Sequence, residues 1–258
     1  MEEIIDLSPS KVSSYCRCPL QFKYSYIDKI KKPIRISMIA GKSGHATFEK
    51  NFKQKPETHE DLSENDLTEF FADNFDTAIK NRDSEIENDG NTPGDTKDKT
   101  VELIKMYKKD RLPNIMPVNA DMVEKWFEIT FDNAPYKMRG YIDLVTDKGI
   151  IMDYKFTGRR QSKEQLENNP QLLCYPLGYQ ALTGKLPKGF RFDFLKTTKK
   201  PELDYEEFKK IDDTKIHWFL RQVALISAAI KTGIFYPSAN PINCSWCGYA
   251  GICRKGGF

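Results

Sequence analysis

The sequence predicts an α/β protein in which a mixed central sheet is flanked by helices. In four segments apolar and polar side chains alternate, as they do along a half-buried strand. In other segments apolar residues recur at the spacing of an amphipathic helix. The expected strands are 122–131, 137–145, 150–156 and 190–195, and the main expected helices are 64–80, 97–109 and 215–231.

Length and composition indicate a soluble protein with one core. A chain of 258 residues can enclose one substantial core, so residues 1–258 are predicted to form a single domain. The chain is 39% hydrophobic and 30% charged, and it has no apolar run long enough to cross a bilayer. Because its start is acidic and unlike a signal peptide, we expect an intracellular, cytoplasmic protein. A net charge of +3 permits nucleic-acid binding, so any such surface must be local.

The amino-terminal segment is predicted to contain two consecutive helices. Ser8 is the expected N-cap of the first helix, which continues to about Cys16. Pro19 would open a second short helix that ends near Ile27 and supplies aromatic surface. A basic run, residues 29–32, follows these helices and is typical of a solvated face.

A third helix is predicted around His45. The preceding Gly41-Lys42-Ser43 resembles the end of a phosphate-binding loop, but that loop needs a glycine where this chain has Ile36. We therefore exclude nucleotide binding there, and a lone helical histidine is usually structural. Residues 57–112 are predicted to be a helical insert that covers a cleft, with a mobile polar loop at 87–98.

The segment 137–157 carries the most informative side chains, on two strands joined by a glycine-containing turn. Alternation separates Asp143 from the apolar set, and it places Asp153 and Lys155 on one face with Tyr154 pointing away. A solvated sheet face would also carry such charges, but the flanking residues are too apolar for an exposed strand. A divalent cation would remove the repulsion between two buried carboxylates and act as a Lewis acid. The pattern predicts metal-assisted hydrolysis of a phosphodiester.

A helix beginning at Asn169-Pro170 places Gln171 and Tyr175 on the same face. Such a pair can hydrogen-bond a water, a phosphate or a base edge, although by itself it is more typical of a helix surface. Pro176 is expected to kink this helix or loosen its first turns.

The cysteines predict a metal or cluster site. A C-x2-C-x5-C array in a polar segment is formed by Cys244, Cys247 and Cys253. Structural zinc and cubane iron–sulfur clusters both take four ligands. We predict Cys18, at a helix junction, as the fourth ligand in preference to Cys16, while Cys174 is expected to be a core thiol. This site would join the segment 240–258 to the start of the chain.

In their order along the chain, these motifs resemble the RecB-like branch of the PD-(D/E)XK nuclease superfamily. The likeness is to its iron–sulfur members, the CRISPR-associated RecB-like exonucleases and the nuclease domain of AddB. The matching segments are Ser8-Pro9-Ser10, Cys18-Pro19, His45 in GHATFE, Gly140 to Asp143, Asp153-Tyr-Lys155, Gln171-x3-Tyr175 and the carboxy-terminal cysteine array. The resemblance implies a restriction-endonuclease-like core at about 120–200.

The resemblance also implies a role for each motif residue. The implied ligands of Mg²⁺ or Mn²⁺ are His45, Asp143, Asp153 and the carbonyl of Tyr154. Lys155 would serve the attacking water, and Gln171 and Tyr175 would complete the catalytic site. The implied ligands of a 4Fe–4S cluster are Cys18, Cys244, Cys247 and Cys253.

The predicted activity is therefore that of a metal-dependent DNA nuclease, an exonuclease acting on single strands or DNA ends, as in DNA repair or recombination. One alternative is a non-catalytic DNA-binding or complex-building subunit, and another is zinc in place of iron. Because the chain lacks a Walker loop, a motor would have to come from a helicase or integrase partner. A phage or mobile-element setting stays open.

Overall fold

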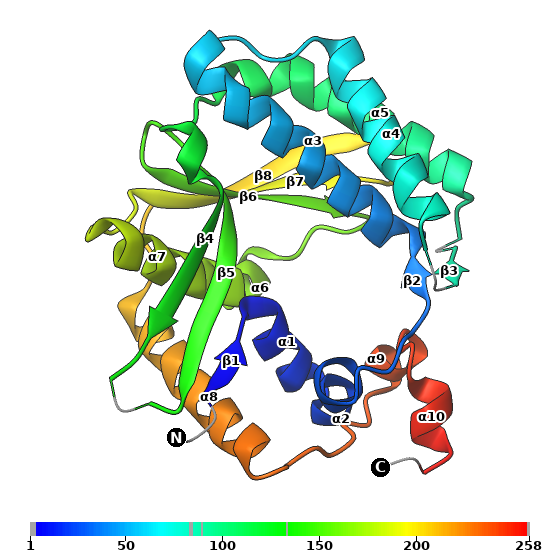
Figure 1. Cartoon of the computed structure of the whole chain (residues 1–258), viewed down its shortest axis with the longest axis vertical. Coiled ribbons are helices and arrows are strands. Elements are labelled where there is room, and N and C mark those ends of the chain that lie inside the picture. Colours follow the sequence, from blue (N-terminus) through cyan, green and yellow to red (C-terminus); the bar gives the residue numbers. More distant parts are fainter. Residues whose placement is uncertain (1–3, 83–84, 89, 133, 257–258) are drawn as a thin grey trace.

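A computed structural model describes residues 4–82, 85–88, 90–132 and 134–256 of the chain (Figure 1). The strands are β1 Ile5–Leu7, β2 Ile34–Arg35, β3 Ile86–Glu87, β4 Val123–Thr130, β5 Tyr136–Val145, β6 Ile150–Thr157, β7 Gly189–Lys196 and β8 Glu202–Phe208. The helices are α1 Pro9–Arg17, α2 Pro19–Phe22, α3 Ile36–Thr58, α4 Glu64–Lys80, α5 Pro93–Asp110, α6 Lys163–Glu167, α7 Pro170–Thr183, α8 Asp213–Lys231, α9 Pro241–Ser245 and α10 Ala250–Arg254. Each of these helices is too short or too polar to cross a membrane.

The main sheet is mixed and is built around β5. Strand β4 pairs with one edge of β5 along most of its length. The other edge is shared, because β1 pairs with residues 136–138 and β6 pairs only with Leu144 and Val145. Between these two paired stretches, at residues 139–143, no strand in the described part of the chain pairs with this edge of β5. This edge of β5 is therefore unpaired beside Asp143, between β1 and β6.

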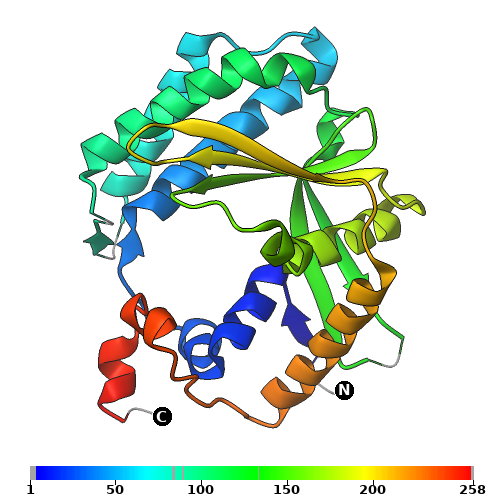
Figure 2. The ribbon, with the colours of Figure 1, turned by 180° about the vertical axis from the view of Figure 1, so that it is seen from behind.

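Helices cover both faces of the sheet, as Figures 1 and 2 show. We call the apolar residues between the sheet and α1, α7 and α8 the first core, and those between the sheet and α3, α4 and α5 the second core. The predicted fold class, a mixed central sheet flanked by helices, is confirmed.

Segments near the two ends of the chain lie side by side. The backbone N–H of Leu20 donates to the carbonyl of Tyr236 at 3.1 Å, and the Tyr15 hydroxyl donates to the carbonyl of Ile234 at 2.6 Å. Helices α9 and α10 lie next to α2 in both views (Figures 1 and 2). The predicted contact between the amino-terminal and carboxy-terminal segments is confirmed.

Some element boundaries differ from those predicted. Helix α5 begins at Pro93, within the predicted loop, because Thr92 and Asp95 form a capping box that fixes the start of the helix. The second amino-terminal helix changes to a π-helical turn at Lys23–Ile27. Strands β1 and β8 were not predicted from the sequence. Strand β8 is polar on most of its surface, so it lacks the apolar alternation of a half-buried strand.

The predicted alternation of β5 fails at Asp143. Ile142 and Val145 both contribute to the first core, whereas Leu144 belongs to the second core. Regular alternation predicts Val145 on the face of Asp143, and this prediction is wrong, because Val145 lies in the first core with Ile142. On β4, Glu124 lies between the residues paired with Ile142 and Leu144, and its φ is 51°. A non-glycine residue in this left-handed region carries strain of about 1–3 kcal/mol, of the kind found at functional sites.

Candidate active site

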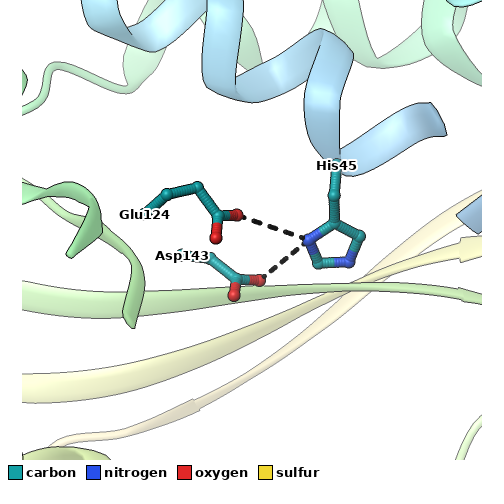
Figure 3. A group of neighbouring side chains, drawn as sticks. All are labelled: His45, Glu124 and Asp143. Carbon is teal, nitrogen blue, oxygen red and sulfur yellow. Dashed lines mark ion pairs between the residues drawn. The ribbon is translucent and has the colours of Figure 1, made fainter. Parts of the chain in front are cut away.

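Three potential metal ligands converge from three different elements (Figure 3). They are His45 on α3, Glu124 on β4 and Asp143 on β5, and one ligand atom from each lies within 4.8 Å of the others. Nδ1 of His45 is 3.3 Å from Oδ2 of Asp143 and 3.9 Å from Oε1 of Glu124. One imidazole and two carboxylates are a donor set suited to a divalent cation such as Mn²⁺.

His45 is held in place by its second ring nitrogen and by the packing of α3. Nε2 of His45 lies 2.8 Å from the carbonyl oxygen of Tyr154 on β6, so this nitrogen donates and Nδ1 faces the carboxylates. The preceding residue, Gly44, allows the close approach of the helix, because a Cβ there would overlap the ring of Phe156. A backbone partner of this kind fixes the orientation of a metal-binding histidine.

Burial and mutual repulsion change the titration of these groups. Burial, followed by the charge of Asp153, raises the pKa of Asp143 to about 7. Burial lowers the pKa of His45, but the carboxylates of Asp143, Glu124 and Asp153 outweigh it and raise that pKa to about 9. The imidazolium form at neutral pH supplies positive charge where the carboxylates crowd together. A bound divalent cation would relieve the same repulsion, so the residues present fit such an ion.

A second network adjoins the three ligands and centres on Asp153, which is fully buried. Nζ of Lys155 lies 2.6 Å from Oδ2 of Asp153, and it also donates to Oε1 of Gln171. Nε2 of Gln171 donates to Oδ1 of Asp153 at 2.7 Å and to the hydroxyl of Tyr175 at 2.9 Å. Four residues predicted for catalysis are therefore joined in one hydrogen-bonded group.

The backbone of β6 connects the two networks. The N–H of Tyr154 donates to Oδ2 of Asp143 at 3.0 Å, and the carbonyl of the same residue faces His45. The side chain of Tyr154 points into the second core, as alternation predicted. Helix α7 continues through Pro176, and Tyr175 still reaches Gln171. Both carboxyl oxygens of Asp153 contact Gln171 or Lys155, and its predicted role as a metal ligand stays a prediction.

Sequence reasoning missed Glu124, because within the strand expected at 122–131 it is one of several polar residues with no motif around it. Its position opposite Asp143 follows from the pairing of β4 with β5, in which Val123 opposes Leu144 and Lys125 opposes Ile142. A search for carboxylates that oppose a motif aspartate across an antiparallel pair would have identified it.

Four of the six cysteines line one cavity of about 220 Å³ between α2 and the carboxy-terminal helices. They are Cys18, Cys244, Cys247 and Cys253, the residues predicted to share a site. The backbone N–H of Ser238 donates to Sγ of Cys18 at 3.4 Å. Cys16 is exposed on α1 away from this cavity, and Cys174 is buried in the first core as predicted. All six cysteines are free of disulfides.

Comparisons with known proteins agree with the geometry of this site. The family model of the PD-(D/E)XK nuclease superfamily matches residues 6–254. A crystal structure of a proposed exonuclease from Eubacterium rectale is similar in fold, with a TM-score of 0.61 and 14% identity, over 98% of this chain and 88% of that chain. The structure of SSO0001 has a TM-score of 0.36 at 13% identity, over 95% of this chain and 94% of that chain. The comparison with curated proteins found no match.

The family match includes every residue of the two networks, since it begins before α1 and ends within α10. It does not distinguish the RecB-like iron–sulfur branch, which stays a prediction. The mixed sheet, the convergence of His45, Glu124 and Asp143, and the adjoining Asp153 and Lys155 agree with this match. This chain belongs to the PD-(D/E)XK nuclease superfamily.

Proposed function

We propose that this chain is a Mg²⁺- or Mn²⁺-dependent deoxyribonuclease of the RecB-like branch, which removes nucleotides from single strands or DNA ends. The observation that carries the proposal is the convergence of His45, Glu124 and Asp143 beside a buried Asp153 that is paired with Lys155. A pure binding protein has no need for a buried aspartate paired with a lysine next to three crowded ligand groups.

The three converging residues would hold the ion, together with Asp153. The carbonyl of Tyr154, a ligand by resemblance, accepts from Nε2 of His45, on the far side of the ring from Nδ1 and the carboxylates. When bound, Mg²⁺ or Mn²⁺ supplies Lewis-acid polarisation of the phosphate and makes a water molecule more acidic. Asp143 contributes a buried carboxylate, and Glu124 contributes one from the strained position on β4. His45 is kept in orientation by the Tyr154 carbonyl.

Lys155 would position the attacking water and stabilise negative charge in the transition state. Its ammonium is anchored by Asp153 and Gln171, which leaves one N–H to point into the site. Gln171 hydrogen-bonds to both Lys155 and Asp153, and the hydroxyl of Tyr175 accepts from the amide of Gln171 and holds it in place. Helix α7 therefore serves to hold the lysine and the aspartate in a single geometry.

The proposal is tested by digesting end-labelled single strands, linear duplex and closed circular DNA in parallel with Mg²⁺ or Mn²⁺. We expect linear and single-stranded DNA to be degraded and closed circles to survive. Asp153→Asn protein and reactions with EDTA should leave every substrate intact. Cleavage of circles would contradict the exonuclease mode, and undiminished cutting by Asp153→Asn protein would contradict the assigned site.

Metal binding is expected to weaken as the pH falls. Ligation needs neutral His45 and ionised Asp143, whose pKa values in the metal-free protein are about 9 and about 7. Between pH 7 and pH 9, metal binding therefore releases one proton, from His45. Below pH 7 it releases a second, from Asp143. The apparent affinity for Mn²⁺ should fall about tenfold per pH unit from 9 to 7, and more steeply below 7. Titration calorimetry in buffers of different ionisation enthalpy measures this release, and a pH-independent affinity would contradict it.

The four cysteines around the cavity are proposed to hold a 4Fe–4S cluster that fastens the two ends of the chain together. Four thiols without disulfides are the donor set of such a cluster. Protein purified without air is expected to be brown, with absorbance near ~400 nm and four irons per chain, and Cys18→Ser should bleach it. Cys16→Ser is the matched control. Colourless wild-type protein with one zinc per chain would contradict the iron assignment.

A further inference from the structure

A large cavity of about 910 Å³ opens on the side of Asp143 away from α3. It lies between α1 and the stretch of β5 from Arg139 to Asp143, where β1 and β6 leave the strand edge unpaired. Gln171 and Tyr175 also line it, so the cavity is continuous with the catalytic network. Of the three candidate metal ligands, Asp143 lines this cavity, while His45 and Glu124 line a second cavity of about 700 Å³ to which Asp143 also contributes. The two cavities therefore share Asp143.

Two exposed aromatic rings form part of the wall of this cavity. Trp126 on β4 and Tyr141 on β5 are cross-strand partners, and their ring centroids are 5.1 Å apart. They keep 39% and 52% of their surface exposed, whereas the aromatic residues of both cores are buried. Because these rings are exposed, they lack the favourable free energy of burying apolar surface, and a planar ligand stacked on them would supply it.

The pair stands next to the proposed metal ligands. Trp126 is two residues from Glu124, and Tyr141 is two residues from Asp143. Residues two apart on a strand lie about 6–7 Å apart, and Asp143 lines the same cavity as both rings. A planar group on these rings would therefore be adjacent to a phosphate held at the metal site.

The remaining lining suits a phosphate backbone. Three cations contribute to it, namely Arg17, Lys32 and Arg139, and the guanidinium of Arg139 lies 5.6 Å from the centre of the Trp126 ring. Serine hydroxyls of α1 line the opposite wall. Among the described lining residues, Asp143 is the one carboxylate. The cavity thus combines positive charge, hydroxyl donors and an aromatic wall.

We propose that this cavity binds one nucleotide of an unpaired DNA strand, with its base stacked on Trp126 and Tyr141 and its phosphates near Arg17 and Arg139. The inference rests on the proposed nuclease function and specifies its substrate as single-stranded. Bases in a duplex are already stacked on both faces, so an aromatic wall favours an unpaired strand. Stacking accepts every base, and the site therefore selects strandedness without selecting sequence.

The test compares binding of a labelled oligodeoxythymidylate with that of an abasic oligomer of equal length. Measured by fluorescence polarisation in EDTA and again in Ca²⁺, wild-type protein should bind the oligomer that carries bases about tenfold more tightly. Trp126→Ala should abolish this preference, and Trp126→Phe should keep most of it. Trp218→Ala, which removes an exposed tryptophan on α8 outside this cavity, is the matched control and should keep all of it.

Equal binding of both oligomers by wild-type protein, or an undiminished preference in Trp126→Ala protein that melts like wild type, would overturn the inference. The inference would also be overturned if wild-type protein bound neither oligomer, either in EDTA or in Ca²⁺. The assay needs no hydrolysis, so its result is separate from that of the digestion experiment. Protein that cuts DNA without preferring bases would disprove the stacking site alone, and protein that prefers bases without cutting would disprove the nuclease alone.

Discussion

Replacing Lys155 with alanine is expected to lower the rate of DNA cleavage by about 10²- to 10⁴-fold, the usual range for loss of a positioned proton-transfer or charge-stabilising group. The ammonium contacts both Asp153 and Gln171, and its removal leaves the buried Asp153 carboxylate without a positive partner. The effect should appear in kcat at saturating metal, since Lys155 is not among the three clustered ligands.

Single-turnover cleavage of a labelled single strand, with the melting temperature recorded for each protein, separates lost chemistry from lost folding. Lys148→Ala is the matched control, because this lysine lies exposed in the turn before β6, at the other end of the strand from Lys155. It should leave cleavage unchanged. Lys155→Ala protein that folds and still cuts at the wild-type rate would remove the lysine from the mechanism.

Replacing Glu124 with glutamine is expected to raise the Mn²⁺ concentration needed for half-maximal activity by at least about 10- to 100-fold, because loss of a group that only supports a ligand already costs that much and Glu124 is itself a proposed ligand. Glu124 faces His45 across the cluster and shares the site with Asp143. The amide keeps the shape of the side chain and removes its charge. Titration calorimetry with Mn²⁺ should show the same loss in the absence of DNA.

Glu128→Gln provides the matched control on the same strand. Glu128 lies four residues further along β4, opposite Arg139, and contacts Lys137 at 2.9 Å, away from His45. Its replacement should leave the metal requirement unchanged. If Glu128→Gln raises the Mn²⁺ requirement as much as Glu124→Gln does, the increase comes from the general charge of β4. If neither variant raises it, Glu124 is not a ligand.

Four residues of the site could be predicted from the sequence because strand alternation and helix spacing constrain them locally. Spacing alone placed Asp153 and Lys155 on one face, and it placed Gln171 and Tyr175 on one side of a helix. The structure brings these four residues into contact. The cysteine spacing likewise selected Cys244, Cys247 and Cys253, and the helix junction at Pro19 selected Cys18, the four thiols that line one cavity.

The remaining features depend on pairing between strands, which local patterns do not encode. Glu124 joins the site only through its register opposite Asp143, together with a left-handed backbone that regular alternation does not anticipate. The divergence of β5 from β6 after two paired residues was equally hidden, since a tight turn predicts a continuous hairpin. Strand β8 escaped prediction because its polar side chains resemble a loop.

The central claim is that His45, Glu124 and Asp143 bind one divalent cation beside Lys155. Anomalous diffraction from crystals of the protein soaked in Mn²⁺ tests it directly. The account predicts a single strong peak within bonding distance of all three side chains, lost in Asp143→Asn crystals. A peak elsewhere, or ligand groups that stay paired with one another in saturating Mn²⁺, would contradict it.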